Sequence, residues 1–112
     1  MKNLSLVVLI ALLSISTTQA QQVFSEDSKY DADVKVFASD SKYDADLLVY
    51  KCSSKYDADG NKGLWFFEDS KYDADKKIYF VDSKYDADLI IYFVDSKYDA
   101  EWRESDKKHL MY

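Results

Sequence analysis

The side chains with the clearest chemical potential lie in one short segment near the middle of the chain. Asp57, Asp59 and Asn61 place oxygen atoms at every second residue, and Glu68 follows at the twelfth position counted from Asp57. A calcium loop of the EF-hand type uses this order, because Ca²⁺ takes about six to eight oxygen ligands around one sharp turn. Lys62, however, stands where that turn requires glycine. The favoured interpretation is an inserted loop whose glycines make its turn, and calcium binding by these four side chains is the alternative.

Acidic residues also recur along the whole chain. An aspartate precedes most copies of the hexapeptide Ser-Lys-Tyr-Asp-Ala-Asp, which itself carries two more. Stacked repeats would align these carboxylates in rows that could hold cations or a basic protein. The favoured interpretation is a solvated acidic face, which the lysine of each hexapeptide balances and which serves capping and solubility.

Aromatic residues are abundant, with ten Tyr, six Phe and two Trp. Their regular placement predicts that most of the rings, including the hexapeptide tyrosines, pack in the core. An exposed aromatic row, which could bind sugars or peptides, is the less favoured interpretation. Trp65 and Trp102 break the regular pattern, so they are the two rings to test for contact with a ligand.

No group of residues is suited to catalysis. Cys52 is the only cysteine, and its alignment with Val81 and Val94 predicts a small buried side chain. The single histidine, His109, lies in a polar C-terminal segment, so a Cys–His pair is not expected. The repeated acids are identical, which leaves no asymmetry between an acid and a base. The sequence therefore predicts no enzyme, and it assigns no catalytic, cofactor-binding or metal-ligating residue.

These residues belong to an internal repeat, which is the strongest signal in the chain. The interval between hexapeptides is 13 residues, except for one interval of 16. A 13-residue unit cannot bury its own apolar face, so the units must share one core. The hexapeptides begin at Ser28, Ser41, Ser54, Ser70, Ser83 and Ser96, and the last copy ends in Glu101 instead of Asp.

Short runs of β-branched and aromatic residues separate the hexapeptides. This composition predicts strands at residues 34–37, 47–50, 64–67, 76–81 and 89–94. Val23 and Phe24 predict a shorter first strand at the edge of the sheet. Each hexapeptide favours a single helical turn capped by Ser or Asp, and a continued strand is the alternative. The expected fold is a β-rich α+β repeat domain of short strands joined by single helical turns, and the periodicity alone indicates a short solenoid.

The first 20 residues are typical of a secretory signal peptide. A basic start, a short apolar core and small polar residues up to Ala20 predict export to the periplasm or the extracellular space. Residues 21–102 then form the repeat domain, and residues 103–112 are expected to be a polar tail. Lys2 is the only charge among the first 20 residues, so the rest carries 14 basic and 21 acidic residues, a net charge of −7. This charge disfavours nucleic acid and anionic membranes as partners, and no later stretch reaches the ~20 apolar residues of a membrane span.

The repeat resembles that of a family of short, uncharacterised bacterial repeat proteins. The resemblance rests on an apolar strand followed by Asp-Ser-Lys-Tyr-Asp-Ala-Asp, and on the Gly-Asn-Lys-Gly-Leu-Trp insertion at residues 60–65. The resemblance covers about residues 22–102. It implies a compact β-rich domain tied in a septafoil, or 7(1), knot, with no established activity and no catalytic residues to carry over. The expected function is an exported, non-catalytic structural or interaction module. The alternative is a module that binds calcium, another cation or a ligand through residues 57–68 or the acidic rows.

Overall fold

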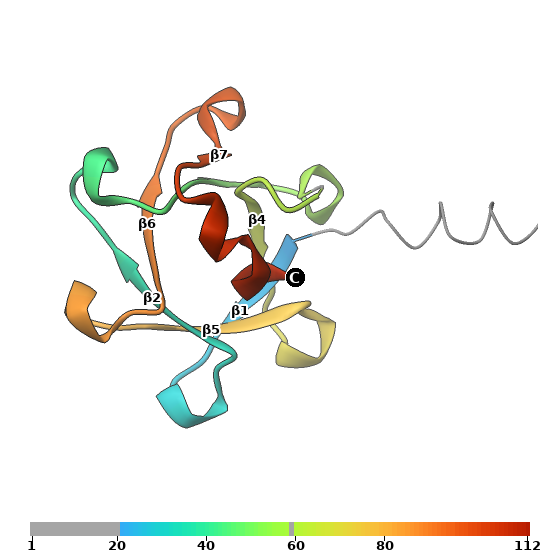
Figure 1. The fold of residues 1–112 in the computed structure, drawn as a ribbon. Helices are drawn as coiled ribbons and strands as arrows, with labels where there is room; N and C mark the ends of the chain where they lie inside the picture. The colour runs from blue at the N-terminus through green and yellow to red at the C-terminus, as the bar shows by residue number, and fades with distance from the viewer. Residues whose placement is uncertain (1–20, 59) are drawn as a thin grey trace, which may run out of the picture.

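The computed structural model describes residues 21–58 and 60–112, so the predicted signal peptide at residues 1–20 and Asp59 lie outside the described residues. Strands alternate with short 3-10 turns throughout this part of the chain (Figure 1). The strands are β1 (Gln21–Ser25), β2 (Val34–Ala38), β3 (Leu47–Lys51), β4 (Leu64–Phe67), β5 (Lys76–Phe80), β6 (Leu89–Phe93) and β7 (Glu101–Trp102). The turns are η1 (Lys29–Asp31), η2 (Lys42–Asp44), η3 (Lys55–Asp57), η4 (Lys71–Asp73), η5 (Lys84–Asp86), η6 (Lys97–Asp99) and η7 (Ser105–Met111).

The first six strands form a closed parallel barrel. Their order around the barrel is β4, β1, β5, β2, β6 and β3, and β3 pairs again with β4. The short strand β7 lies antiparallel to β3. The predicted strands and the single helical turns are therefore confirmed, whereas the open solenoid is wrong. The prediction of a shorter first strand at the edge is also wrong, because β1 has 5 residues, like β2, and pairs with β4 on one side and β5 on the other.

The strands are strongly staggered, which explains how such short connections can join parallel strands. Ser25 at the end of β1 and Val34 at the start of β2 both pair with Ile78 of β5, from opposite sides. The end of one strand and the start of the next thus lie at the same height on the barrel. The connection at residues 26–33 only has to pass over β5, so the chain winds around the barrel as a spiral.

This spiral makes two interleaved laps. The strands β1, β2 and β3 occupy alternate positions of the barrel, and β4, β5 and β6 fill the gaps between them. The change of lap occurs between β3 and β4, which are direct neighbours, and it coincides with the longer interval in the sequence. Gly63 in this insertion has φ +92°, and a Cβ atom there would collide with the carbonyl oxygen of Leu48. The insertion therefore fits closely against β3 while it shifts the second lap by one position.

The core lies inside the barrel. Alternate residues of each strand point inward, as the pleat requires, and Trp65 is the largest of the fully buried side chains. A C-terminal segment also reaches the core, because Met111 of η7 is fully buried and Gln21 donates a hydrogen bond to its carbonyl oxygen over 3.2 Å. The expected polar tail thus contains a 3-10 segment that packs its last apolar residue inward, and the Lys107 ammonium of this segment donates hydrogen bonds to the Asp46 carboxylate and the Asp88 carbonyl oxygen. The core comprises Val23, Val34, Val36, Leu47, Val49, Trp65, Ile78, Leu89, Ile91 and Met111.

The six hexapeptide turns, η1–η6, project outward from the barrel, and we call them the arms (Figure 1). In every arm the serine is the N-cap, and its hydroxyl accepts a hydrogen bond from the backbone N–H of the tyrosine two residues later. This cap satisfies a donor that one isolated helical turn would leave free.

The last aspartate of the hexapeptide fastens an arm to the strand that it passes over. Asp33 donates its backbone N–H to the carbonyl oxygen of Lys77 over 2.7 Å, and its carboxylate accepts the N–H of Lys77 over 3.0 Å. We call this pair of hydrogen bonds the reciprocal clamp. The same clamp recurs three times, joining Asp46 to Ile90, Asp75 to Gln22 and Asp88 to Lys35.

Residues 21–58 and 60–112 contain no helix with the length and apolar composition that crossing a bilayer requires.

The reciprocal clamp predicts a position-specific loss of stability. Asp33→Ala removes the acceptor for the Lys77 N–H, so the free energy of unfolding should fall by about 1 kcal/mol, whereas Asp33→Asn keeps an oxygen acceptor and should lose less. The matched control is Asp31→Ala in the same hexapeptide, which should change the free energy by less than about 0.5 kcal/mol. Equilibrium urea unfolding measures all three variants, and equal losses for the two alanine variants would contradict the clamp.

Candidate functional site

The tyrosines of the arms are exposed, so the prediction that they pack in the core is wrong. Each ring has between 76% and 87% of its surface in contact with solvent. The reason is the geometry of the arm, because the turn that the serine caps carries its tyrosine away from the barrel. The interior is filled by strand residues instead. The exposed rings are Tyr30, Tyr43, Tyr56, Tyr72, Tyr85 and Tyr98.

Each arm tyrosine is accompanied by the lysine that precedes it. The ammonium group lies over the ring at 5.4–5.6 Å from the centroid in all six arms. Such a cation–π contact contributes about 0.5–1 kcal/mol at an exposed site and restricts the motion of both side chains. The aspartate that follows each tyrosine is exposed as well. Every arm therefore presents the same ammonium, ring and carboxylate to the solvent.

The residues of the hexapeptide divide into two groups. The serine caps the turn and the last aspartate makes the reciprocal clamp, so both have structural roles. The central Lys-Tyr-Asp packs against no core cluster of the described residues, yet it is identical in all six copies. The strands vary more, since β2, β3 and β4 differ from one another at most positions, although β5 and β6 share Ile-Tyr-Phe at their ends. The stabilising interaction described for this central part is the contact between its lysine and its tyrosine.

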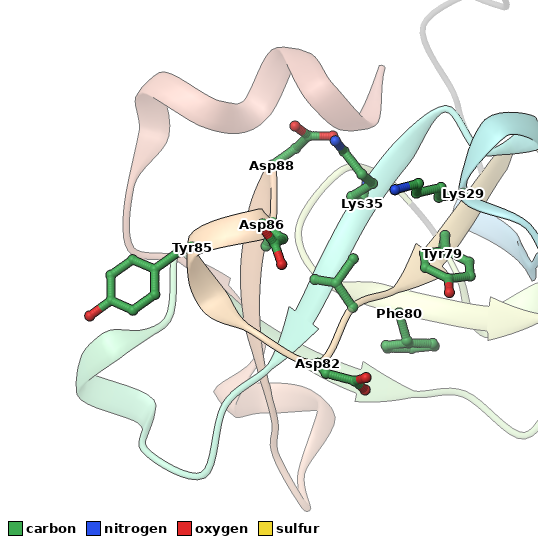
Figure 2. Close-up of a pocket in the computed structure, with 10 residues that line it drawn as sticks. Lys29, Lys35, Tyr79, Phe80, Asp82, Tyr85, Asp86 and Asp88 are labelled. Atoms are coloured by element: carbon green, nitrogen blue, oxygen red, sulfur yellow. The ribbon is translucent and has the colours of Figure 1, made fainter.

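Three of the grooves on the outer wall of the barrel lie between neighbouring arms and have three kinds of residue in common. Figure 2 shows the largest, which has a volume of about 550 Å³ and is lined by Tyr79 on the strand, Lys29 of arm η1, and Tyr85 and Asp86 of arm η5. The other two have volumes of about 460 and 320 Å³. In each groove a half-buried strand tyrosine lines the wall, one arm supplies a lysine and another arm supplies an aspartate. These trios are Tyr79, Lys29 and Asp86; Tyr92, Lys42 and Asp99; and Tyr50, Lys97 and Asp57.

The charged groups of the grooves keep their hydrogen-bonding capacity. Within residues 21–58 and 60–112, one ion pair is formed, between the Lys107 ammonium and the Asp46 carboxylate at 3.2 Å. It joins η7 to the residue that precedes β3. None of the three groove lysines or groove aspartates takes part in it. Ammonium donors and carboxylate acceptors thus line the grooves side by side.

Of the four candidate calcium residues, the structure describes Asp57, Asn61 and Glu68. Asn61 serves another purpose, because its backbone oxygen accepts the Trp102 indole N–H over 2.9 Å and its amide donates to the Lys108 carbonyl oxygen over 3.0 Å. Asp57 is exposed on arm η3, and Asp59 lies outside the described residues. Among the described residues, no group of three or more His, Cys, Asp and Glu side chains has metal-binding geometry.

The two tryptophans have structural surroundings. Trp65 is fully buried in the barrel, so it is unavailable to a ligand. Trp102 packs against the core and binds Asn61, which joins β7 to the insertion. The sequence missed the strand tyrosines of the grooves as candidate residues. The sequence did contain a signal for them. Side chains alternate between the two faces of a strand, so a residue next to an inward apolar residue must lie on the outer wall of the barrel.

The comparisons with known proteins agree with this architecture. A family model described as a 7(1) septoil knot domain matches residues 20–103. The chain belongs to this family. Searches of curated proteins and of solved structures found no match. Membership in the septoil knot family confirms the resemblance stated from the repeat.

Cys52 of this septoil knot domain is buried, as its alignment with valines predicts. It packs with Ala58 and Leu64 in a small cluster on the wall of the barrel. His109 lies in η7, with Nδ1 2.9 Å from the carbonyl oxygen of Asp106, and no hydrogen bond of the described residues joins it to the thiol. Burial is the main cause that raises the pKa of the Cys52 thiol above its ordinary value of 9.0, and the carboxylate of Asp57 adds to the rise.

This raised pKa predicts how stability depends on pH. The thiolate forms more readily in the unfolded chain, so the contribution of Cys52 is complete below about pH 9 and is lost as the pH rises through the pKa of the folded state. Between about pH 8 and pH 10, the free energy of unfolding of the wild type should therefore fall relative to that of Cys52→Val. Urea unfolding of both proteins across this range tests it, and a difference that stays constant would contradict it.

Proposed function

We propose that this chain is an exported, non-catalytic interaction module in which the barrel is the scaffold and the arms are the binding surface. The observation that carries the proposal is the 76–87% exposure of all six arm tyrosines. A ring left in water gains no hydrophobic free energy on folding, so recognition of a partner accounts for six such rings better than stability does. The septoil knot family supports the scaffold half of the proposal, since such a domain suggests a structural module.

The arms are suited to binding because they are held in place before a partner arrives. The serine cap fixes the start of each turn, and in four arms the reciprocal clamp fixes its end. Tyrosine offers a large amphipathic surface with few rotatable bonds, so little conformational entropy is lost on contact. The structure thus supports a surface of six preorganised rings.

The first 20 residues support export, and cleavage near Ala20 would release a chain of one domain without a disulfide. Stability in that setting must come from the packed barrel. The two interleaved laps support the further proposal that the chain is threaded into the seven-crossing knot that the family description names. A threaded chain resists local opening, because one unit cannot leave the barrel alone.

The binding role can be tested with envelope material from the producing cells. The purified chain should sediment with this material, and a variant with all six arm tyrosines changed to alanine should lose at least about tenfold in binding, because several weak contacts act together. Its free energy of unfolding should fall by no more than about 0.5–1 kcal/mol per substitution, which is the contribution of each lysine–tyrosine contact. Tyr112→Ala is the matched control, since Tyr112 is 74% exposed but lies outside the arms. Undiminished sedimentation of the six-alanine variant would disprove the role of the arms.

Durability can be tested by prolonged protease digestion. The expected product is a single fragment close to the size of residues 21–112, because cleavage requires unfolding of the whole barrel. A ladder of fragments in steps of 13 residues would show that units open singly, which is contrary to the proposal.

A further inference from the structure

We infer that the three grooves between the arms bind the sugar units of a neutral polysaccharide, an inference that rests on the proposed binding role of the arms. The grooves are the hollows in which the strand tyrosines Tyr50, Tyr79 and Tyr92 meet charged groups of two different arms. Their volumes, about 320–550 Å³, fall in the range of ~300–1,000 Å³ that is usual for small-molecule sites.

The composition of each groove matches the chemistry of a sugar ring. A sugar presents an apolar C–H face, which the half-buried tyrosine of the groove can contact, and hydroxyl groups that both donate and accept hydrogen bonds. The lysine at one side is a donor only, and the aspartate at the other is an acceptor only. In Figure 2 the pair is Lys29 and Asp86, which come from arms on either side of Tyr79. Because neither is in an ion pair within the described residues, both are available to hydroxyl groups.

The negative charge of the protein disfavours acidic polymers as ligands. The chain carries a net charge of −6, and carboxylates line all three grooves, so a polymer of phosphates or acidic sugars would be repelled. A purely apolar ligand would leave the lysine and aspartate of each groove without partners, which costs binding free energy. A neutral polymer of hydroxyl-bearing units meets neither obstacle.

The repetition of the grooves indicates that the ligand is itself repetitive. Arms of the same composition surround the barrel at regular positions, whereas an ordinary protein partner offers different chemistry to each of them. A polysaccharide, or a surface made of its chains, repeats one unit. Several weak contacts then act together and raise the overall affinity by about 10²–10⁴.

The test is sedimentation of the full chain with insoluble cellulose, chitin and starch, with alginate beads as the acidic polymer. The chain should bind at least one of the neutral polysaccharides more tightly than alginate. The variant Tyr50→Ala/Tyr79→Ala/Tyr92→Ala should bind about two- to tenfold more weakly per groove, whereas the corresponding Tyr→Phe variant keeps the rings and should stay within about threefold of the wild type.

A second variant keeps the test valid if the alanine variant does not fold. Asp57→Asn/Asp86→Asn/Asp99→Asn changes exposed arm residues, so it should leave the melting temperature unchanged and weaken polysaccharide binding by about two- to tenfold. Binding to none of the neutral polymers, preference for alginate, or binding that neither triple variant reduces would each overturn the inference. If the wild type still sediments with the cell envelope in those cases, the arms bind another component, and the proposed function stands without this ligand.

Discussion

The reciprocal clamp is the contact on which the architecture depends. A connection that leaves one strand and enters the next must pass over a strand of the other lap and be held at a fixed height above it. The aspartate at the end of the hexapeptide solves this problem with two hydrogen bonds to a single residue, as between Asp33 and Lys77. The clamp thus sets both the height of the connection and the offset between the two laps. Barrel closure follows from repeating this offset.

The same six residues therefore serve two purposes that do not interfere. Serine and the last aspartate make the hydrogen bonds that determine the path of the chain, while lysine, tyrosine and the first aspartate face the solvent. Because the structural contacts involve mainly the backbone, the strands between the hexapeptides are free to vary as long as one face stays apolar. This separation explains how a barrel with diverse strands can carry an identical surface at every arm.

Strands and turns could be predicted from the sequence, because their signals are local. Runs such as Leu89–Phe93 are β-branched and aromatic, and a serine before Lys-Tyr-Asp is a local cap. The position of the arm tyrosines could not be predicted, because a ring beside a small alanine suggests core packing whereas the turn points the ring outward. The burial of Met111 and the two partners of β1 depend on residues more than 40 positions away. Closure of the barrel was also beyond local reasoning, since it requires the offset of all six strands.

The closed ring of two laps has a consequence for how such proteins can change size. An open solenoid accepts an additional unit at either end, because each unit contacts only its neighbours. Here every position around the ring is taken, and the insertion at Gly60–Gly63 stands between the three strands of the first lap and the three barrel strands of the second. Duplication or loss of a single unit would leave a gap or an extra strand with no partner. The number of units is thus set by the geometry, and variation is confined to the strand residues and the arms.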